Sequence, residues 1–173
     1  MNALEPFVQL AASLNQASVR FVTIGVSGAN LWARSGHTIF TTRDYDLFLP
    51  SDADNARRAW QAAEGCLLEL YCGDEPLDRP RDQFLAERII AQRTLVRATD
   101  GEGFDVDLTL VMAGFEFDGV YSRRRTFAVE GVSIPVASLR DIVSSKAAAG
   151  REKDRLFLAA HAEALKALIE GED

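Results

Sequence analysis

The chain has 173 residues, a formal net charge of −7 at pH 7, and 47% hydrophobic and 26% charged residues. This composition is typical of one folded domain, long enough to bury a core without disulfides or a structural metal. The acidic balance excludes broad electrostatic adhesion to nucleic acid, so any such contact would require a local basic patch.

No segment is long and apolar enough to cross a bilayer, and the first residues lack the pattern of a signal peptide. We therefore expect a cytoplasmic protein without a membrane partner. Two cysteines, Cys66 and Cys72, are too few for a disulfide framework, and no second Cys/His cluster completes a zinc site. We expect both to be buried free thiols.

The first part of the chain reads as helix, strand, tight turn and helix. Helical spacing of apolar residues predicts a helix over residues 4–15, and a β-branched run predicts a strand over 20–25. Small residues then open a second helix. Backbone amides at such a turn can approach a phosphate, because the helix dipole and the free N–H groups both favour an anion. The alternative is an ordinary strand-to-helix connection.

Two carboxylates, Asp44 and Asp46, precede an apolar run in TTRDYDLFLP, residues 41–50. In a strand, residues two apart point to the same face, which places these side chains roughly 6–7 Å apart. Paired carboxylates suit a hard divalent cation that also binds the phosphate oxygens of a substrate. The alternative is a solvated strand edge whose alternate residues happen to be acidic.

The remaining sequence predicts alternating helices, strands and one exposed loop. Predicted helices cover residues 52–64 with Ser51 as N-cap, 138–149 with Ser138 as N-cap and Gly150 as terminator, and 152–169. Predicted strands cover residues 67–72, 89–98, 104–111, 127–129 and 132–136. We expect one hairpin between 89–98 and 104–111 and a second between 127–129 and 132–136. Residues 73–83 contain two prolines and alternating charges, which predict an exposed and mobile loop.

A second acidic pair, Asp105 and Asp107, lies in GFDVDLTL. Asp107 is deeper in its predicted strand, whereas Asp105 is near the mouth of a hairpin, so we choose Asp107 as a third site carboxylate. Three carboxylates from two neighbouring strands could hold one or two metal ions, and the third could accept the proton of an attacking hydroxyl. The alternative for Asp107 is a second acidic strand edge.

These motifs together resemble the nucleotidyltransferase fold of the DNA polymerase beta superfamily. Its signature is a small-residue turn that opens a helix, an acidic pair on the next strand, and a third acid on a later strand. IGVSGANLWA, TTRDYDLFL and FDVDL match these parts in order. The turn reads Gly25-Val26-Ser27-Gly28, without the adjacent Gly-Gly or Gly-Ser of the family, so Ser27-Gly28 is the candidate functional pair.

The C-terminal part, SIPVASLRDIVSSKAAAGREKDRLFL, is similar to the ending of small bacterial nucleotidyltransferase-like proteins, including those related to AbiEii-type toxins of toxin–antitoxin systems. In that pattern a lysine on one helix is followed, after a glycine, by R-x-K-D. The corresponding residues here are Lys146, Arg151, Lys153 and Asp154. The resemblance covers roughly residues 20–158.

The resemblance implies one α/β (α+β) domain over residues 1–173, with a mixed sheet and packed helices over about 20–137 and a C-terminal helical pair over about 138–170. It also implies metal-dependent transfer of a nucleoside monophosphate from a nucleoside triphosphate, such as ATP, to an acceptor hydroxyl. The acceptor would be an RNA such as a tRNA, a small molecule or a protein. The alternative is a catalytically silent protein that binds a nucleotide or a partner, such as a cognate antitoxin.

The implied site divides into metal-binding and nucleotide-binding residues. A Mg2+ or Mn2+ ion would be held by the catalytic carboxylates Asp44, Asp46 and Asp107. The triphosphate would be held by Gly25, Ser27, Gly28, Thr42, Lys146 and Lys153. Lysine suits this role because its ammonium group is a compact positive charge; the alternative for both lysines is a solvated basic helix end.

Overall fold

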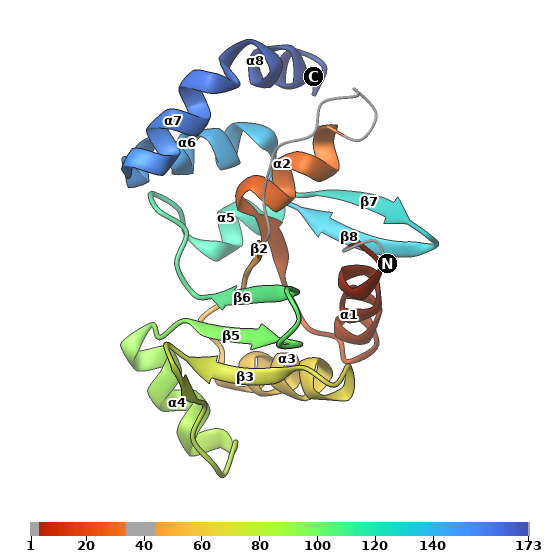
Figure 1. Cartoon of the computed structure of the whole chain (residues 1–173), viewed down its shortest axis with the longest axis vertical. Helices are drawn as coiled ribbons and strands as arrows, with labels where there is room; N and C mark the ends of the chain where they lie inside the picture. The colour runs from red at the N-terminus through yellow and green to blue at the C-terminus, as the bar shows by residue number, and fades with distance from the viewer. Residues whose placement is uncertain (1–3, 34–43, 173) are drawn as a thin grey trace.

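The computed structural model describes residues 4–33 and 44–172. One mixed eight-stranded sheet runs through this part of the chain, in the order β4-β3-β5-β6-β2-β1-β8-β7 (Figure 1). The strands are β1 (Val22–Ile24), β2 (Asp44–Phe48), β3 (Glu69–Cys72), β4 (Glu75–Pro76), β5 (Val96–Thr99), β6 (Asp105–Thr109), β7 (Arg125–Val129) and β8 (Val132–Val136).

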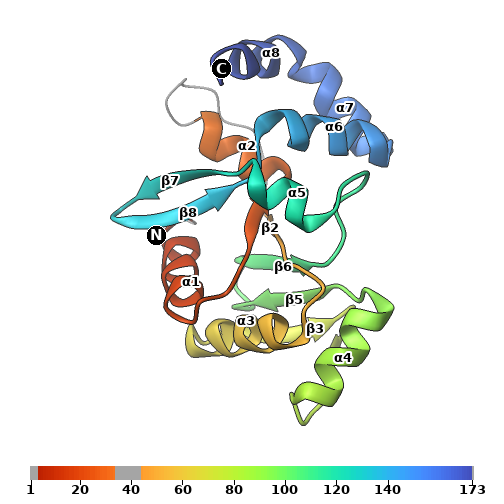
Figure 2. The ribbon, with the colours of Figure 1, turned by 180° about the vertical axis from the view of Figure 1, so that it is seen from behind.

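Helices flank the sheet on both sides, which confirms the predicted α/β class. They are α1 (Leu4–Gln16), α2 (Gly25–Ala33), α3 (Ala53–Gly65), α4 (Gln83–Gln92), α5 (Phe117–Ser122), α6 (Leu139–Ala149), α7 (Glu152–Ala160) and α8 (Ala162–Glu170). Helix α1 packs on α3 and β8, whereas α6 packs on α2, α7 and α8 (Figures 1 and 2). Within the described residues, no helix is long and apolar enough to cross a membrane.

Strand β2 lies at the centre of the sheet, and the strands paired with it determine which residues lie beside Asp44 and Asp46. It pairs with β1 in antiparallel and with β6 in parallel orientation. The end of β2 is buried at Leu47 and Phe48, while Asp44 to Asp46 are only partly buried. Buried side chains such as Phe21 and Trp60 fill the core beneath the strands. The acidic half of β2 is therefore fixed to a rigid core but remains open at its start.

The C-terminal helical pair begins where it was predicted. The Ser138 side chain accepts a hydrogen bond from the Asp141 backbone N–H at 3.1 Å, which satisfies one of the free donors at the start of α6. Gly150 ends α6 with φ +61°, a conformation that glycine adopts without steric cost. The predicted final helix over 152–169 is divided at His161 into α7 and α8.

Several predicted boundaries are wrong. Asp52, and not Ser51, caps α3, since its side chain accepts from the Asn55 backbone N–H. The predicted strand over 89–98 is in its first half the end of helix α4, which Asp82 caps and whose apolar residues contact the core at helical spacing. Residues 73–83 are not simply a loop, because they include β4 and the buried Leu77.

Helix α5, Phe117–Ser122, is absent from the sequence-based expectation. The two cysteines are free as predicted, but Cys66 and Cys72 are only partly buried. Trp32 of α2 is buried, and its indole N–H donates to the Ala137 carbonyl at 2.9 Å. This bond ties α2 to the segment that leads into α6, so the two helices beside the acidic half of β2 are held together.

Candidate functional site

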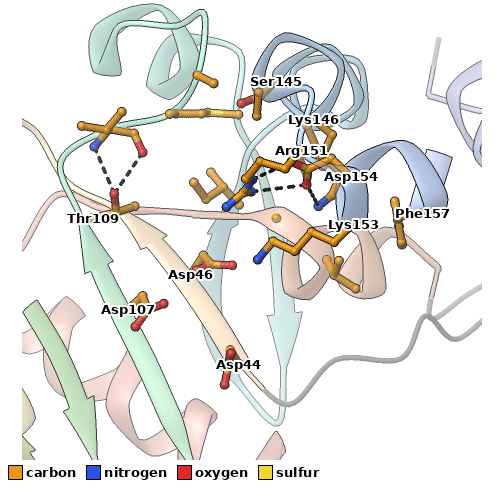
Figure 3. Close-up of a pocket in the computed structure, with 18 of the residues that line it drawn as sticks. Asp44, Asp46, Asp107, Thr109, Ser145, Lys146, Arg151, Lys153, Asp154 and Phe157 are labelled. Atoms are coloured by element: carbon orange, nitrogen blue, oxygen red, sulfur yellow. Dashed lines mark hydrogen bonds and ion pairs between the residues drawn. The ribbon is translucent and has the colours of Figure 1, made fainter. Parts of the chain in front are cut away.

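A cleft of about 790 Å3 opens between the acidic half of the sheet and the helices α6 and α7 (Figure 3). One wall carries Asp44 and Asp46 of β2 with Asp107 of β6, and the other carries Lys146 and Lys153. The structure therefore brings together, around one open space, the three predicted carboxylates and the two predicted lysines. Three parts of the chain that are far apart in the sequence, β2, β6 and the α6–α7 pair, meet there.

The parallel pairing of β2 with β6 sets the acids side by side. Asp46 is the register partner of Asp107, and Asp44 is the register partner of Asp105. Neighbouring strands lie about 4.8 Å apart, so partners on the same face stand next to each other. Asp107, the residue chosen as the third site carboxylate, lines the cleft, and Asp105 does not. In Figure 3 the Asp46 and Asp107 side chains lie near each other, and Asp44 lies apart from them at the start of β2.

Asp46 is the electrostatic centre of this wall. Its pKa is raised to about 6, chiefly by burial and then by the neighbouring Asp107, against the opposing effect of Lys146. Within the described part of the chain, no donor forms a hydrogen bond with its carboxylate. A partly buried carboxylate without a donor is costly to ionise, and a bound cation would relieve that cost.

Position 25, at the junction of β1 and α2, requires a glycine because the backbone there lies very close to Asp46. Its φ is +68°, and a Cβ built on it would lie 2.6 Å from Asp46 Oδ2. Only glycine combines that backbone conformation with the absence of a side chain. Gly25 and the adjacent Val26 line the cleft, so the backbone at the start of α2 borders the carboxylates.

Ser27 and Gly28 face the interior and do not line the cleft. The buried Ser27 hydroxyl donates to the Ile24 carbonyl at 2.9 Å and accepts from the Asp46 backbone N–H at 3.2 Å. A Cβ on Gly28 would lie 3.0 Å from the Thr23 carbonyl oxygen. Ser27 thus braces β2 and Gly28 allows close helix packing. Their contact with a triphosphate stays a prediction, and Thr42 lies outside the described residues.

The basic wall is built around a buried carboxylate, Asp154, which is 1% exposed. Arg151 Nε donates to it at 2.7 Å and Lys146 Nζ at 3.4 Å. Burial alone would raise the pKa of Asp154, but the hydrogen bond from Arg151 and the charge of Lys146 outweigh it and lower the pKa. Lys146 is therefore held in place beside the cleft, and Lys153 extends into it (Figure 3).

Arg97 of β5 is the site residue that the sequence analysis missed. It lines the cleft, lies opposite Asp107 in the β5–β6 pairing, and donates to both Asp107 oxygens at 2.8 and 3.2 Å. That hydrogen bonding raises the pKa of the guanidinium above its already high usual value. Also missed were three exposed apolar side chains that line the same cleft: Leu95, Val111 and Leu156.

The carboxylates fit a hard divalent cation by their chemistry, since Mg2+ binds carboxylate oxygens together with phosphate oxygens. Their present spacing is looser than a formed metal site: within residues 4–33 and 44–172, no three Asp, Glu, His or Cys side chains form a group that could hold an ion. Arg97 already engages both oxygens of Asp107. Asp46 remains open to a cation.

Comparison with known proteins adds no relative. No protein-family model matches the chain, and a search of curated proteins found no significant match. The functional argument therefore depends on the cleft and its residues.

Proposed function

We propose that this protein is a metal-dependent nucleotidyltransferase, which moves a nucleoside monophosphate from a nucleoside triphosphate to an acceptor hydroxyl. One observation carries the proposal: a single open cleft has three carboxylates on one wall and two lysines on the other. A nucleoside triphosphate with its cation needs both kinds of wall, because the cation binds carboxylates while the phosphates bind cationic groups. The cleft is also large enough for a small-molecule ligand.

The basic wall would bind the phosphates. Lys146 and Lys153 would contact the outer phosphate oxygens, and the backbone at Gly25 would approach the chain of phosphates from the start of α2. Asp44, Asp46 and Asp107 would hold a divalent cation, which when bound polarises phosphate oxygens and offsets their charge. The ion pair between Lys146 and Asp154 fixes one of these groups before the nucleotide arrives.

Asp107 would act on the acceptor. Its carboxylate would accept the proton of the acceptor hydroxyl as the hydroxyl oxygen forms a bond to the α-phosphorus. The bond from the α-phosphorus to the bridging oxygen breaks in the same displacement, and pyrophosphate leaves with the electron pair. A general base of this kind contributes about 10²–10⁴-fold to the rate.

The second candidate is a catalytically silent nucleotidyltransferase-like protein that binds a nucleotide or a partner protein, such as an antitoxin. The observation in its favour is the engagement of Asp107 by Arg97, which uses both carboxylate oxygens. A carboxylate held in this way has fewer lone pairs available for a metal or a proton. The two candidates therefore differ in whether Asp107 becomes available when the ligands bind.

Transfer of a labelled nucleotide tests the proposal directly. The protein is incubated with each of four α-labelled nucleoside triphosphates, Mg2+, and a panel of RNA, small-molecule and protein acceptors. We expect label on one acceptor class with the parent and with Asp105→Asn, which removes a carboxylate that does not line the cleft. Asp46→Asn should abolish it. Binding of a nucleotide without any labelled product would support the silent candidate instead.

A further inference from the structure

A guanidinium group lies among the carboxylates of the cleft wall and the neighbouring Asp105. We call Asp44, Asp46, Asp105 and Asp107 the acidic cluster. Arg97 donates to both oxygens of Asp107, and it also approaches a carboxylate oxygen of Asp44 and one of Asp105 to 3.9 Å. One guanidinium charge therefore lies within ion-pair distance of three of the four carboxylates.

We propose that Arg97 is an internal cation that competes with a divalent metal ion for the acidic cluster. The inference depends on the proposed function, because it assumes that the metal binds the three members of the cluster that line the cleft, Asp44, Asp46 and Asp107. A metal ion and a guanidinium seek the same oxygens, and Arg97 already takes one lone pair from each oxygen of Asp107. The two cations also repel each other at the short distances within the cluster.

The exposure of the two partners shows which one can move. The Arg97 side chain is 41% exposed, whereas that of Asp107 is 14% exposed. The Arg97 guanidinium can thus leave Asp107 by rotation about the side-chain bonds of Arg97, which move it into the adjacent cleft while the sheet stays unchanged. Asp107 is fixed on β6 between two paired strands. A phosphate group in the cleft would offer the released guanidinium a new bidentate partner.

Competition of this kind links the metal to the availability of Asp107. Without the metal, Arg97 keeps the Asp107 oxygens occupied and offsets the repulsion between neighbouring carboxylates. When a metal ion enters beside Asp46, Arg97 is released, and Asp107 becomes available to the ion and to the acceptor proton. Arg97 is a positioning residue in this account, since it acts through Asp107.

Calorimetric titration with Mn2+ alone, at low ionic strength and without nucleotide, tests this inference. The parent is compared with Arg97→Gln, which removes the charge, and with Arg97→Lys, which keeps the charge but cannot form the two parallel hydrogen bonds. Arg88→Gln is the matched control, because Arg88 is exposed on α4 and does not line the cleft. Circular dichroism checks that each variant is folded.

We expect Arg97→Gln to bind Mn2+ at least about tenfold more tightly than the parent, a difference of about 1.4 kcal/mol. Arg97→Lys should lie between them, and Arg88→Gln should match the parent within about twofold. If Arg97→Gln fails to fold, a tighter affinity in Arg97→Lys than in the parent supports the inference and an equal or weaker one overturns it.

The outcome separates this inference from the proposed function. Equal or weaker binding by Arg97→Gln, with clear binding by the parent, overturns the competition and leaves the metal site intact. Binding by Arg97→Gln alone supports the competition and contradicts metal-dependent activity in the parent. No binding by any variant overturns both.

Discussion

Replacing Asp46 by Asn should stabilise the folded protein at neutral pH. The pKa of Asp46 in the folded protein is about 6, against 3.8 for an unperturbed aspartate, so folding disfavours the ionised form. A raised pKa contributes stability that is fully present below about pH 4 and is lost as the pH rises through about 6. Asn keeps the size of the side chain and removes the charge, so the variant escapes this loss.

The shift gives the size of the effect. A difference of about 2 pKa units corresponds to about 3 kcal/mol, and partial relaxation of the site lowers this to about 1–3 kcal/mol. For a chain of this length the melting temperature should rise by roughly 3–8 °C. Urea unfolding of parent and Asp46→Asn at pH 4.5 and pH 7.5 measures it, with Asp105→Asn as the control for loss of a carboxylate elsewhere in the cluster.

We expect Asp46→Asn to be more stable than the parent at pH 7.5, and the difference at pH 4.5 to be about a third as large. Adding Mg2+ should narrow the gap at pH 7.5, because the cation relieves the cost of the charge in the parent only. A difference that does not change with pH, or a parent that is more stable at pH 7.5, would refute the electrostatic reasoning.

Three further predictions concern the other parts of the cleft. Lys146→Met should weaken Mg2+-nucleotide binding about tenfold, the scale of one charged hydrogen bond; an unchanged affinity by calorimetry would assign Lys146 to the support of Asp154. Gly25→Ala should destabilise the fold by about 1–3 kcal/mol, because its φ of +68° and the 2.6 Å approach to Asp46 both disfavour a side chain; a melting temperature equal to that of the parent would contradict this. Asp154→Asn should destabilise by about 2–4 kcal/mol, since it leaves Lys146 and Arg151 without their buried partner; urea unfolding measures it, and a change under about 0.5 kcal/mol would mean that the ion pairs are not structural.

Local periodicity was sufficient to predict the acidic half of the sheet. Asp44 and Asp46 alternate with apolar residues, as do Asp105 and Asp107, and the strands formed as predicted. Their parallel pairing depends on the whole sheet order, which no local pattern contains. That pairing sets Asp46 beside Asp107, so the sequence predicted the carboxylates and the fold brought them together.

Arg97 was missed because of the register of the β5–β6 hairpin. The predicted strands over 89–98 and 104–111 leave residues 99–103 as the loop, which would set Arg97 opposite Asp105. The actual loop runs from Asp100 to Phe104, with the Asp100 side chain accepting two backbone N–H groups, and Arg97 faces Asp107 instead. The Asp100 side chain, which organises this loop, thus helps to set the register in which Arg97 meets Asp107.

The end of helix α4 was predicted as the start of a strand because its residues have high β-propensity. Ile89 and Ile90 favour a strand by β-propensity, but the Asp82 cap and the burial of Leu85 and Ile89 at helical spacing decide the segment. Tertiary packing outweighs local propensity where a cap and an apolar face agree. The apolar spacing continues through His161 and therefore did not predict the division between α7 and α8.

Mass spectrometry of the acceptor panel, after incubation with a nucleoside triphosphate and Mg2+, tests the central claim most directly. The parent should add the mass of one nucleoside monophosphate to an acceptor. Asp107→Asn, which keeps the shape of the side chain, should lower the rate about a hundredfold or more while nucleotide binding falls much less. The account is contradicted if the parent binds nucleotide but modifies no acceptor, or if Asp107→Asn transfers as fast as the parent.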